Sequence, residues 1–226
     1  MNEAYNVDCM EYMRGLPDNA FDLAVCDPPY GAGIAENGGC RGWFDKYNVL
    51  AADCRNARGR FSKYSDTDIR HWDIAPPQEY FEEIFRVSRN QIIWGGNYFS
   101  LPPTRCFLVW RKLTISENFT MAMAEYAWTS FDSNAKVFDL MPQGKASDPR
   151  FHPTQKPVEL YAWIYNLFAQ KGDKILDTHL GSGSSRIAAY DAGLDFVGCE
   201  IEPYYFQKQE ERFAAHTAQR SLFETE

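Results

Sequence analysis

Four consecutive residues, Asp27-Pro28-Pro29-Tyr30, carry the side chains of this sequence that are best suited to chemistry. They follow the apolar run 21–26, which predicts a buried strand. Proline has no N–H and a fixed φ, so the turn is stiff and its carbonyl groups are held outward. The acid and the carbonyls accept hydrogen bonds, and the aromatic ring offers a face for stacking. Such a site suits a planar group that carries an NH2, as adenine and cytosine do.

A second element begins about 150 residues later, with a predicted strand that ends in Asp177. A glycine-rich turn, Gly181-x-Gly183, follows it, then a predicted helix over 186–192 and a strand over 195–200 that ends in Glu200. Glycines let a backbone approach a ligand, and a strand-end acid binds ribose hydroxyls. The turn lacks the third glycine of the dinucleotide fingerprint and the lysine of a P-loop. A phosphate-free adenosine cofactor such as S-adenosylmethionine is therefore favoured over a dinucleotide, and a plain structural turn is the alternative.

Two further segments complete a pattern that resembles a known family. His152-Pro153-Thr154-Gln155-Lys156-Pro157 is similar to an HPTxKP element, and 6–17 is similar to the segment that precedes the catalytic strand. Together these motifs resemble the DNA amino-methyltransferases, which methylate the N6 amine of adenine or the N4 amine of cytosine. The catalytic motif comes first and the glycine turn late, as in the permuted β class.

The resemblance implies a fold, a cofactor and a substrate. The fold is α/β and Rossmann-like, with a mostly parallel sheet covered by helices on both faces and a circularly permuted motif order. The methyl donor is S-adenosylmethionine. The substrate is double-stranded DNA, whose target base is flipped out because its amine cannot be reached inside the duplex.

The resemblance also assigns roles to individual residues. Asp27 and the carbonyl of Pro28 accept hydrogen bonds from the target amine, Pro29 completes the turn, and Tyr30 stacks on the extruded base. Thr154 and Lys156 are candidates for the carboxylate of the cofactor. The expected cofactor-binding residues are Asp8, Thr154, Lys156, Asp177, His179, Gly181, Ser182, Gly183 and Glu200.

The cofactor turn departs from the family pattern at three positions. Thr178 and His179 stand where proline and phenylalanine are usual, and Leu180 replaces a smaller residue. These changes bear on how the cofactor packs, whereas the glycines themselves are kept.

The aspartate that begins the catalytic motif favours an adenine-N6 enzyme, since serine at this position is typical of the cytosine-N4 enzymes. Three alternatives stay open: a cytosine-N4 enzyme, an RNA-directed relative with the same chemistry, and a nucleic-acid-binding relative without turnover.

Composition is consistent with an enzyme of the cytoplasm, in the setting of DNA methylation or restriction-modification. The chain has 226 residues and a formal net charge of −8. Its six cysteines are scattered without a CxxC pair, which predicts neither a metal site nor a disulfide framework. No segment approaches the roughly 20 apolar residues of a membrane span.

The pattern predicts one methyltransferase domain over 1–226 with an insertion at 31–75. The insertion carries glycine, aromatic and basic residues, which predicts a loop close to DNA. Residues 132–151 are too few for a separate large target-recognition domain, so sequence recognition falls to the insertion, this short loop, a homodimer partner or another protein. Between positions 41 and 63 the insertion carries Arg41, Lys46, Arg55, Arg58, Arg60 and Lys63.

Strands that alternate with amphipathic helices predict the mostly parallel sheet. Helices are predicted over 8–14, 77–89, 157–170 and 203–215, and strands over 91–94, 106–110 and 125–131. The last residues, 217–226, are predicted to be disordered.

Overall fold

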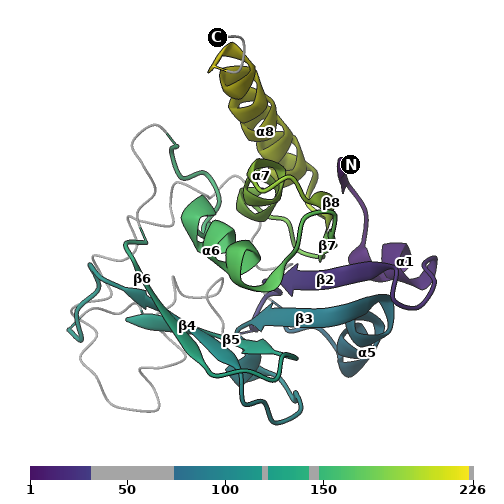
Figure 1. Ribbon diagram of the computed structural model, residues 1–226, viewed down its shortest axis with the longest axis vertical. Helices are drawn as coiled ribbons and strands as arrows, with labels where there is room; N and C mark the ends of the chain where they lie inside the picture. Colours follow the sequence, from purple (N-terminus) through teal and green to yellow (C-terminus); the bar gives the residue numbers. More distant parts are fainter. Residues whose placement is uncertain (32–73, 119–121, 143–147, 224–226) are drawn as a thin grey trace.

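The computed structural model describes residues 1–31, 74–118, 122–142 and 148–223 (Figure 1). The greater part of the 31–75 insertion lies outside the described residues. Eight strands form one sheet in the order β1-β8-β7-β2-β3-β5-β4-β6. The strands are β1 (Asn2–Tyr5), β2 (Phe21–Cys26), β3 (Ser88–Trp94), β4 (Phe107–Lys112), β5 (Ala124–Thr129), β6 (Lys136–Leu140), β7 (Lys174–Asp177) and β8 (Asp195–Cys199).

The central strands are parallel, as the sequence predicts. β2 pairs with β3 on one side and with β7 on the other, where Leu23 is the register partner of Ile175. β8 lies between β7 and β1 and is parallel to both. Only β5 runs against its two neighbours, β3 and β4, among the strands that the structure describes. The permuted order of the motifs is thus reconciled with a continuous sheet, because the early strand β2 and the late strand β7 are direct neighbours.

Helices cover both faces of the sheet (Figure 1). α6 (Val158–Phe168) and α7 (Ser184–Asp191) pack on one face, where Leu23, Val25 and Ile92 meet Leu160 and Ile164. α1 (Cys9–Arg14) and α5 (Gln78–Val87) pack on the other face, where Ala24 and Cys26 meet the apolar side of α5. The successive residues of β2 therefore serve two cores, which explains why its sequence is a continuous apolar run and not an alternating one.

The parallel strands bring the predicted motifs to one edge of the sheet. Asp27 follows β2, the glycine turn follows β7, and Glu200 follows β8. Gly95 and the 3-10 turn η4 (Gly96–Tyr98) follow β3 at the same edge. The carboxyl ends of parallel strands are where α/β proteins bind ligands.

Three of the sequence predictions about the elements need correction. β1 and β6 were not predicted, and β6 occupies 136–140 within the segment interpreted as a short loop. The last helix, α8 (Pro203–Phe223), continues through residues that the sequence predicted to be disordered. Good helix formers such as Gln, Glu, Arg and Ala are frequent in α8, and Lys208 pairs with Glu211 one turn later.

Candidate functional site

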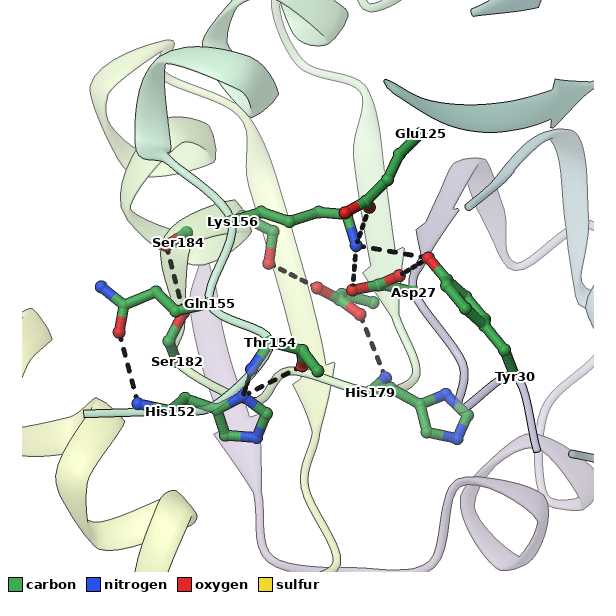
Figure 2. A network of polar contacts seen from close by, with 12 residues as sticks. Asp27, Tyr30, Glu125, His152, Thr154, Gln155, Lys156, His179, Ser182 and Ser184 are labelled. Carbon is green, nitrogen blue, oxygen red and sulfur yellow. Dashed lines mark hydrogen bonds and ion pairs between the residues drawn. The ribbon is translucent and has the colours of Figure 1, made fainter. Parts of the chain in front are cut away.

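The catalytic turn leaves β2 with both oxygens of Asp27 engaged (Figure 2). The Tyr30 hydroxyl donates to Asp27 Oδ1 over 2.7 Å. The Lys156 ammonium donates to Asp27 Oδ2. An ionised carboxylate has about four lone-pair sites, so these two donors leave acceptor capacity for a further N–H group.

Lys156 lies at the catalytic acid, although the sequence placed it with the carboxylate of the cofactor. Its side chain is 4% exposed, and its Nζ also lies 3.1 Å from Glu125 Oε2 and 3.4 Å from the Tyr30 hydroxyl. Burial alone would lower the pKa of this ammonium, but the carboxylates of Asp27 and Glu125 outweigh burial and raise it. Lys156 is therefore a cation fixed beside the catalytic turn, and contact with a cofactor stays a prediction.

The aromatic ring of the catalytic turn is held by the loop that follows β3. Tyr30 stacks on Tyr98 with ring centroids 5.0 Å apart, and it meets Phe99 edge-on at 6.2 Å. Gly95 adopts a φ of +69°, and a Cβ placed there would come within 2.2 Å of the Tyr30 ring. The glycine thus lets the backbone lie directly against the ring, and the exposed Tyr98 extends the aromatic surface toward solvent.

The glycine turn lies beside this centre, between β7 and α7. Gly181 and Gly183 have φ values of +51° and +75°, a backbone region that L-residues with side chains rarely adopt. Gly181 N–H donates to Glu200 Oε2 over 2.8 Å, and Glu202 N–H donates to Glu200 Oε1 over 2.9 Å. Burial raises the pKa of Glu200, against the opposing effect of these amides. The strand-end acid and the glycine turn are therefore joined by a direct hydrogen bond.

The Asp177 carboxylate contacts residues on both sides of the glycine turn. It accepts hydrogen bonds from His179 N–H, over 3.0 Å, and from the Ser185 hydroxyl. The residue is 1% exposed, and burial raises the pKa of the carboxyl to about 7. These contacts give Asp177 a role in holding the shape of the loop.

Two of the three departures, Thr178 and His179, form a polar cluster with Tyr80 next to the turn. His179 Nδ1 lies 3.0 Å from Thr178 Oγ1 and 3.3 Å from the hydroxyl of Tyr80 on α5. Tyr80 and Thr178 also bond to each other over 2.6 Å. Burial lowers the pKa of His179 to about 4, so the ring is neutral at physiological pH. The cluster gives the buried His179 ring polar partners.

The HPTxKP-like segment crosses from the glycine turn to the catalytic acid (Figure 2). His152 packs on Tyr205 at 4.3 Å, and its ring lies against Gly181. His152 Nδ1 accepts from Thr154 N–H over 3.3 Å, and burial lowers the pKa of the ring to about 3. The Thr154 hydroxyl lies 3.2 Å from the same nitrogen. His152 is thus a neutral ring that packs the segment against Tyr205 and the glycine turn.

Two other predicted residues have local partners. Asp8 caps α1, because its side chain accepts from Met10 N–H over 2.7 Å and from Glu11 N–H over 3.1 Å. The Ser182 hydroxyl lies 3.1 Å from that of Ser184, and the Ser182 carbonyl accepts from Arg212. A contact of Asp8 or Ser182 with the cofactor stays a prediction.

Sequence reasoning missed Glu125 and Tyr80, which contact the predicted residues directly. The signal for Glu125 is an acid in a segment, 124–129, that is otherwise largely apolar. Tyr80 lies within the predicted helix 77–89 and its ring is buried, but its hydroxyl bonds to Thr178, next to the glycine turn. Within the described part of the chain, no group of three or more His, Cys, Asp and Glu side chains is arranged to hold a metal ion. No helix among the described residues is long and apolar enough to cross a membrane.

Comparisons with known proteins agree with this geometry. The DNA methylase family, of the N6/N4 type, matches residues 64–211. The Escherichia coli (strain K12) protein named "Putative methylase YubD" is 28% identical over 216 residues, which are 92% of this chain and 88% of that protein. The type II methyltransferase M2.MboI of Moraxella bovis is 24% identical over 252 residues, covering 92% of this chain and 86% of the relative.

Solved structures share the fold. The PvuII DNA methyltransferase, a cytosine-N4-specific enzyme, has a TM-score of 0.59 at 10% identity, covering 96% of this chain and 91% of that one. The complex of M1.HpyAVI with S-adenosylmethionine has a TM-score of 0.52 at 18% identity, covering 94% of this chain and all of that one. Both confirm the Rossmann-like methyltransferase fold.

The family match covers more than half of the chain, and the protein therefore belongs to the DNA methylases of the N6/N4 type. Members of this family methylate exocyclic amines of DNA bases and use S-adenosylmethionine as the methyl donor. The matched residues include the HPTxKP-like segment, the glycine turn and Glu200. They begin after Asp27–Tyr30, so the role of the catalytic turn is argued from its geometry.

Proposed function

We propose that this protein methylates the N6 amine of adenine in DNA, with S-adenosylmethionine as donor. One observation carries the proposal: the turn with Asp27 and the glycine turn follow two hydrogen-bonded parallel strands, β2 and β7, at one edge of the sheet. An amine held at the first turn would thus lie beside a cofactor held at the second. Family membership supports the reaction class, and the aspartate in the catalytic turn supports adenine.

The described residues fit the proposed cofactor. The positive φ of Gly181 and Gly183 opens the turn to a close approach, and α7 begins at Ser184 without a side-chain cap. Glu200 offers carboxylate oxygens at the end of β8, where ribose hydroxyls would be recognised. When bound, S-adenosylmethionine supplies an electrophilic methyl group.

The catalytic turn would activate the amine by accepting its hydrogen bonds. The lone pair of an exocyclic amine is delocalised into the base, which makes the nitrogen a poor nucleophile. Asp27 and the Pro28 carbonyl, acting as two acceptors, favour a tetrahedral nitrogen whose lone pair points toward the methyl group. This stabilisation is stronger in the transition state than in the ground state, and it therefore accelerates the reaction. The nitrogen would form a bond to the methyl group as the sulfonium–methyl bond breaks and the neutral thioether leaves, and it would lose one proton, for which the Asp27 carboxylate is the proposed acceptor.

Tyr30 would stack on the flipped base, next to Tyr98. A base–aromatic stack contributes roughly 1–3 kcal/mol. In this proposal the single domain has no separate recognition domain, and the 31–75 insertion contributes to DNA binding. A homodimer is a second source of DNA contacts.

The experiment is methyl transfer from labelled S-adenosylmethionine to unmethylated genomic DNA, followed by mass spectrometry of the nucleosides. N6-methyladenine is the expected product. N4-methylcytosine would overturn the choice of base while keeping the amine chemistry. RNA is assayed in parallel, and transfer to RNA alone would overturn the choice of DNA.

A further inference from the structure

A second carboxylate, that of the half-buried Glu125 on β5, lies on the far side of Lys156 from Asp27, with 22% of its side chain exposed (Figure 2). Its Oε2 is 3.1 Å from Lys156 Nζ, and its Oε1 pairs with the ammonium of Lys112 on β4. The side chains of Lys156 and Lys112 are 4% and 6% exposed. Four charges of alternating sign thus run from the catalytic turn into the sheet, in the order Asp27, Lys156, Glu125 and Lys112.

This row is electrically balanced. Two carboxylates face two ammonium groups, and each inner member contacts a partner on both sides. Burial alone would raise the pKa of Glu125, but Lys156 and Lys112 outweigh burial and lower it to about 2. A buried charge that loses its partner is strongly unfavourable, whereas a neutral set is tolerated. Glu125 therefore makes it feasible to keep a protonated lysine beside the catalytic acid.

The geometry also surrounds the lysine ammonium with oxygen atoms. An ammonium has three N–H donors. Lys156 has three oxygen neighbours: Asp27 Oδ2, Glu125 Oε2 at 3.1 Å and the Tyr30 hydroxyl at 3.4 Å. Its Nζ also lies 5.3 Å from the centroid of the Trp94 ring, which closes another side. Without the Glu125 carboxylate, Asp27 would be the one described carboxylate left to pair with this ammonium, which would then compete with the target amine for the free lone pairs of Asp27.

We propose that Glu125 is a positioning residue for methyl transfer: it shares Lys156 with Asp27 and so keeps the acceptor face of Asp27 open to the amine. This inference rests on the proposed function, because it deepens the role of the same site. Glu125 acts through Lys156 and does not itself touch the substrate.

The test compares Glu125→Gln with the double variant Glu125→Gln/Lys112→Gln, each against the parent protein. The single variant leaves Lys112 unpaired and is expected to melt at a lower temperature. The double variant removes both charges of the outer pair and is expected to recover most of the melting temperature. In both, kcat should fall by about 10- to 100-fold, since a displacement on the order of 1 Å can cost about 100-fold. Binding of S-adenosylmethionine should stay unchanged.

The control is Asp139→Asn, which removes one carboxylate from the more exposed pair that Asp139 on β6 forms with Arg111 on β4. It should leave kcat at the parental value. If kcat returns to the parental value in the double variant together with stability, Glu125 is only structural and the inference is overturned. If the single variant keeps the parental kcat, the inference is overturned as well. A parent protein that transfers no methyl group would instead overturn the proposed function, and this inference with it.

Discussion

Replacement of Gly95 by alanine should separate the aromatic platform from the rest of the site. Gly95 has a φ of +69°, and the added Cβ would meet Tyr30 Cε1 at 2.2 Å. No real Cβ contact is that short, so the Tyr30 ring must move. The ring is stacked on Tyr98, and its hydroxyl bonds to Asp27, so both contacts are lost or lengthened when it moves.

The magnitude follows from these contacts. The strained φ costs roughly 1–2 kcal/mol in stability for a residue with a Cβ. The displaced ring loses its stack on the flipped base, worth roughly 1–3 kcal/mol. Each 1.36 kcal/mol is tenfold in rate, so kcat/KM for DNA should fall by about 5- to 150-fold. Affinity for S-adenosylmethionine should stay at the parental value, because the glycine turn follows another strand.

Gly193→Ala is the matched control. Gly193 has nearly the same φ, +68°, but an added Cβ there has no neighbour within 4 Å. It should reproduce the loss of stability from backbone strain and leave the rate of transfer unchanged. The assays are thermal unfolding, calorimetry with S-adenosylmethionine, and initial rates on DNA. Equal effects of the two substitutions on transfer would refute the role of the Gly95–Tyr30 contact.

Three further predictions concern the cofactor side. Burial raises the pKa of Asp177 to about 7 from an ordinary value of 3.8, so between these pH values the folded state binds a proton that the unfolded chain does not. The contribution of Asp177 to the free energy of unfolding therefore falls as pH rises between these two values, by at most about 4 kcal/mol. Asp177→Asn should remove this contribution to the pH dependence of stability, which denaturant unfolding at pH 5 and pH 8 would measure. Below about pH 6.5 the buried neutral rings of His152 and His179 act in the opposite direction, because their burial costs stability there. The informative quantity is therefore the difference in pH slope between Asp177→Asn and the parent protein. An identical slope in the two proteins would contradict the account. Glu200→Gln retains only one side-chain carbonyl oxygen for two amide donors, and calorimetry should show about 10-fold weaker binding of S-adenosylmethionine, with undiminished affinity as the contrary result. His179→Phe removes the contact with Tyr80 and Thr178 and should cost roughly 0.5–1.5 kcal/mol of unfolding free energy, whereas a stabilised variant would show that the polar cluster contributes nothing.

The parts of the fold that the sequence predicted are those with strong local signals. The catalytic strand, the glycine turn and the amphipathic helices α5 and α6 have apolar patterns that do not depend on distant partners. The sequence did not predict that β2 and β7 are neighbours, because these strands are about 150 residues apart and pair only in the folded sheet. β1, with four residues, and β6, with only partly buried side chains, carry little local signal, and their pairing with β8 and β4 fixes them.

The candidate site also has residues whose roles the sequence predicted and residues whose partners it did not. The residue types of Asp27, Tyr30 and the glycine turn are enough to predict a hydrogen-bond acceptor, a stacking ring and a backbone open to a cofactor. The partners of Lys156 could not be predicted, because Asp27 is 129 positions away and Glu125 lies on an antiparallel strand that no motif marks. Asp8 was interpreted by motif resemblance, yet its nearest donors are the first amides of α1, which any helix must satisfy. Ion pairs between residues far apart in the sequence, and capping contacts at helix ends, depend on the folded geometry.

The most direct test of the central claim is methyl transfer to unmethylated DNA by the parent protein and by Asp27→Ala, with binding of S-adenosylmethionine measured on both by calorimetry. The account predicts N6-methyladenine from the parent, transfer abolished in the variant, and cofactor binding largely intact in both. Methyl transfer at the parental rate by Asp27→Ala would contradict the account, because the amine would then be activated without the acid at the end of β2.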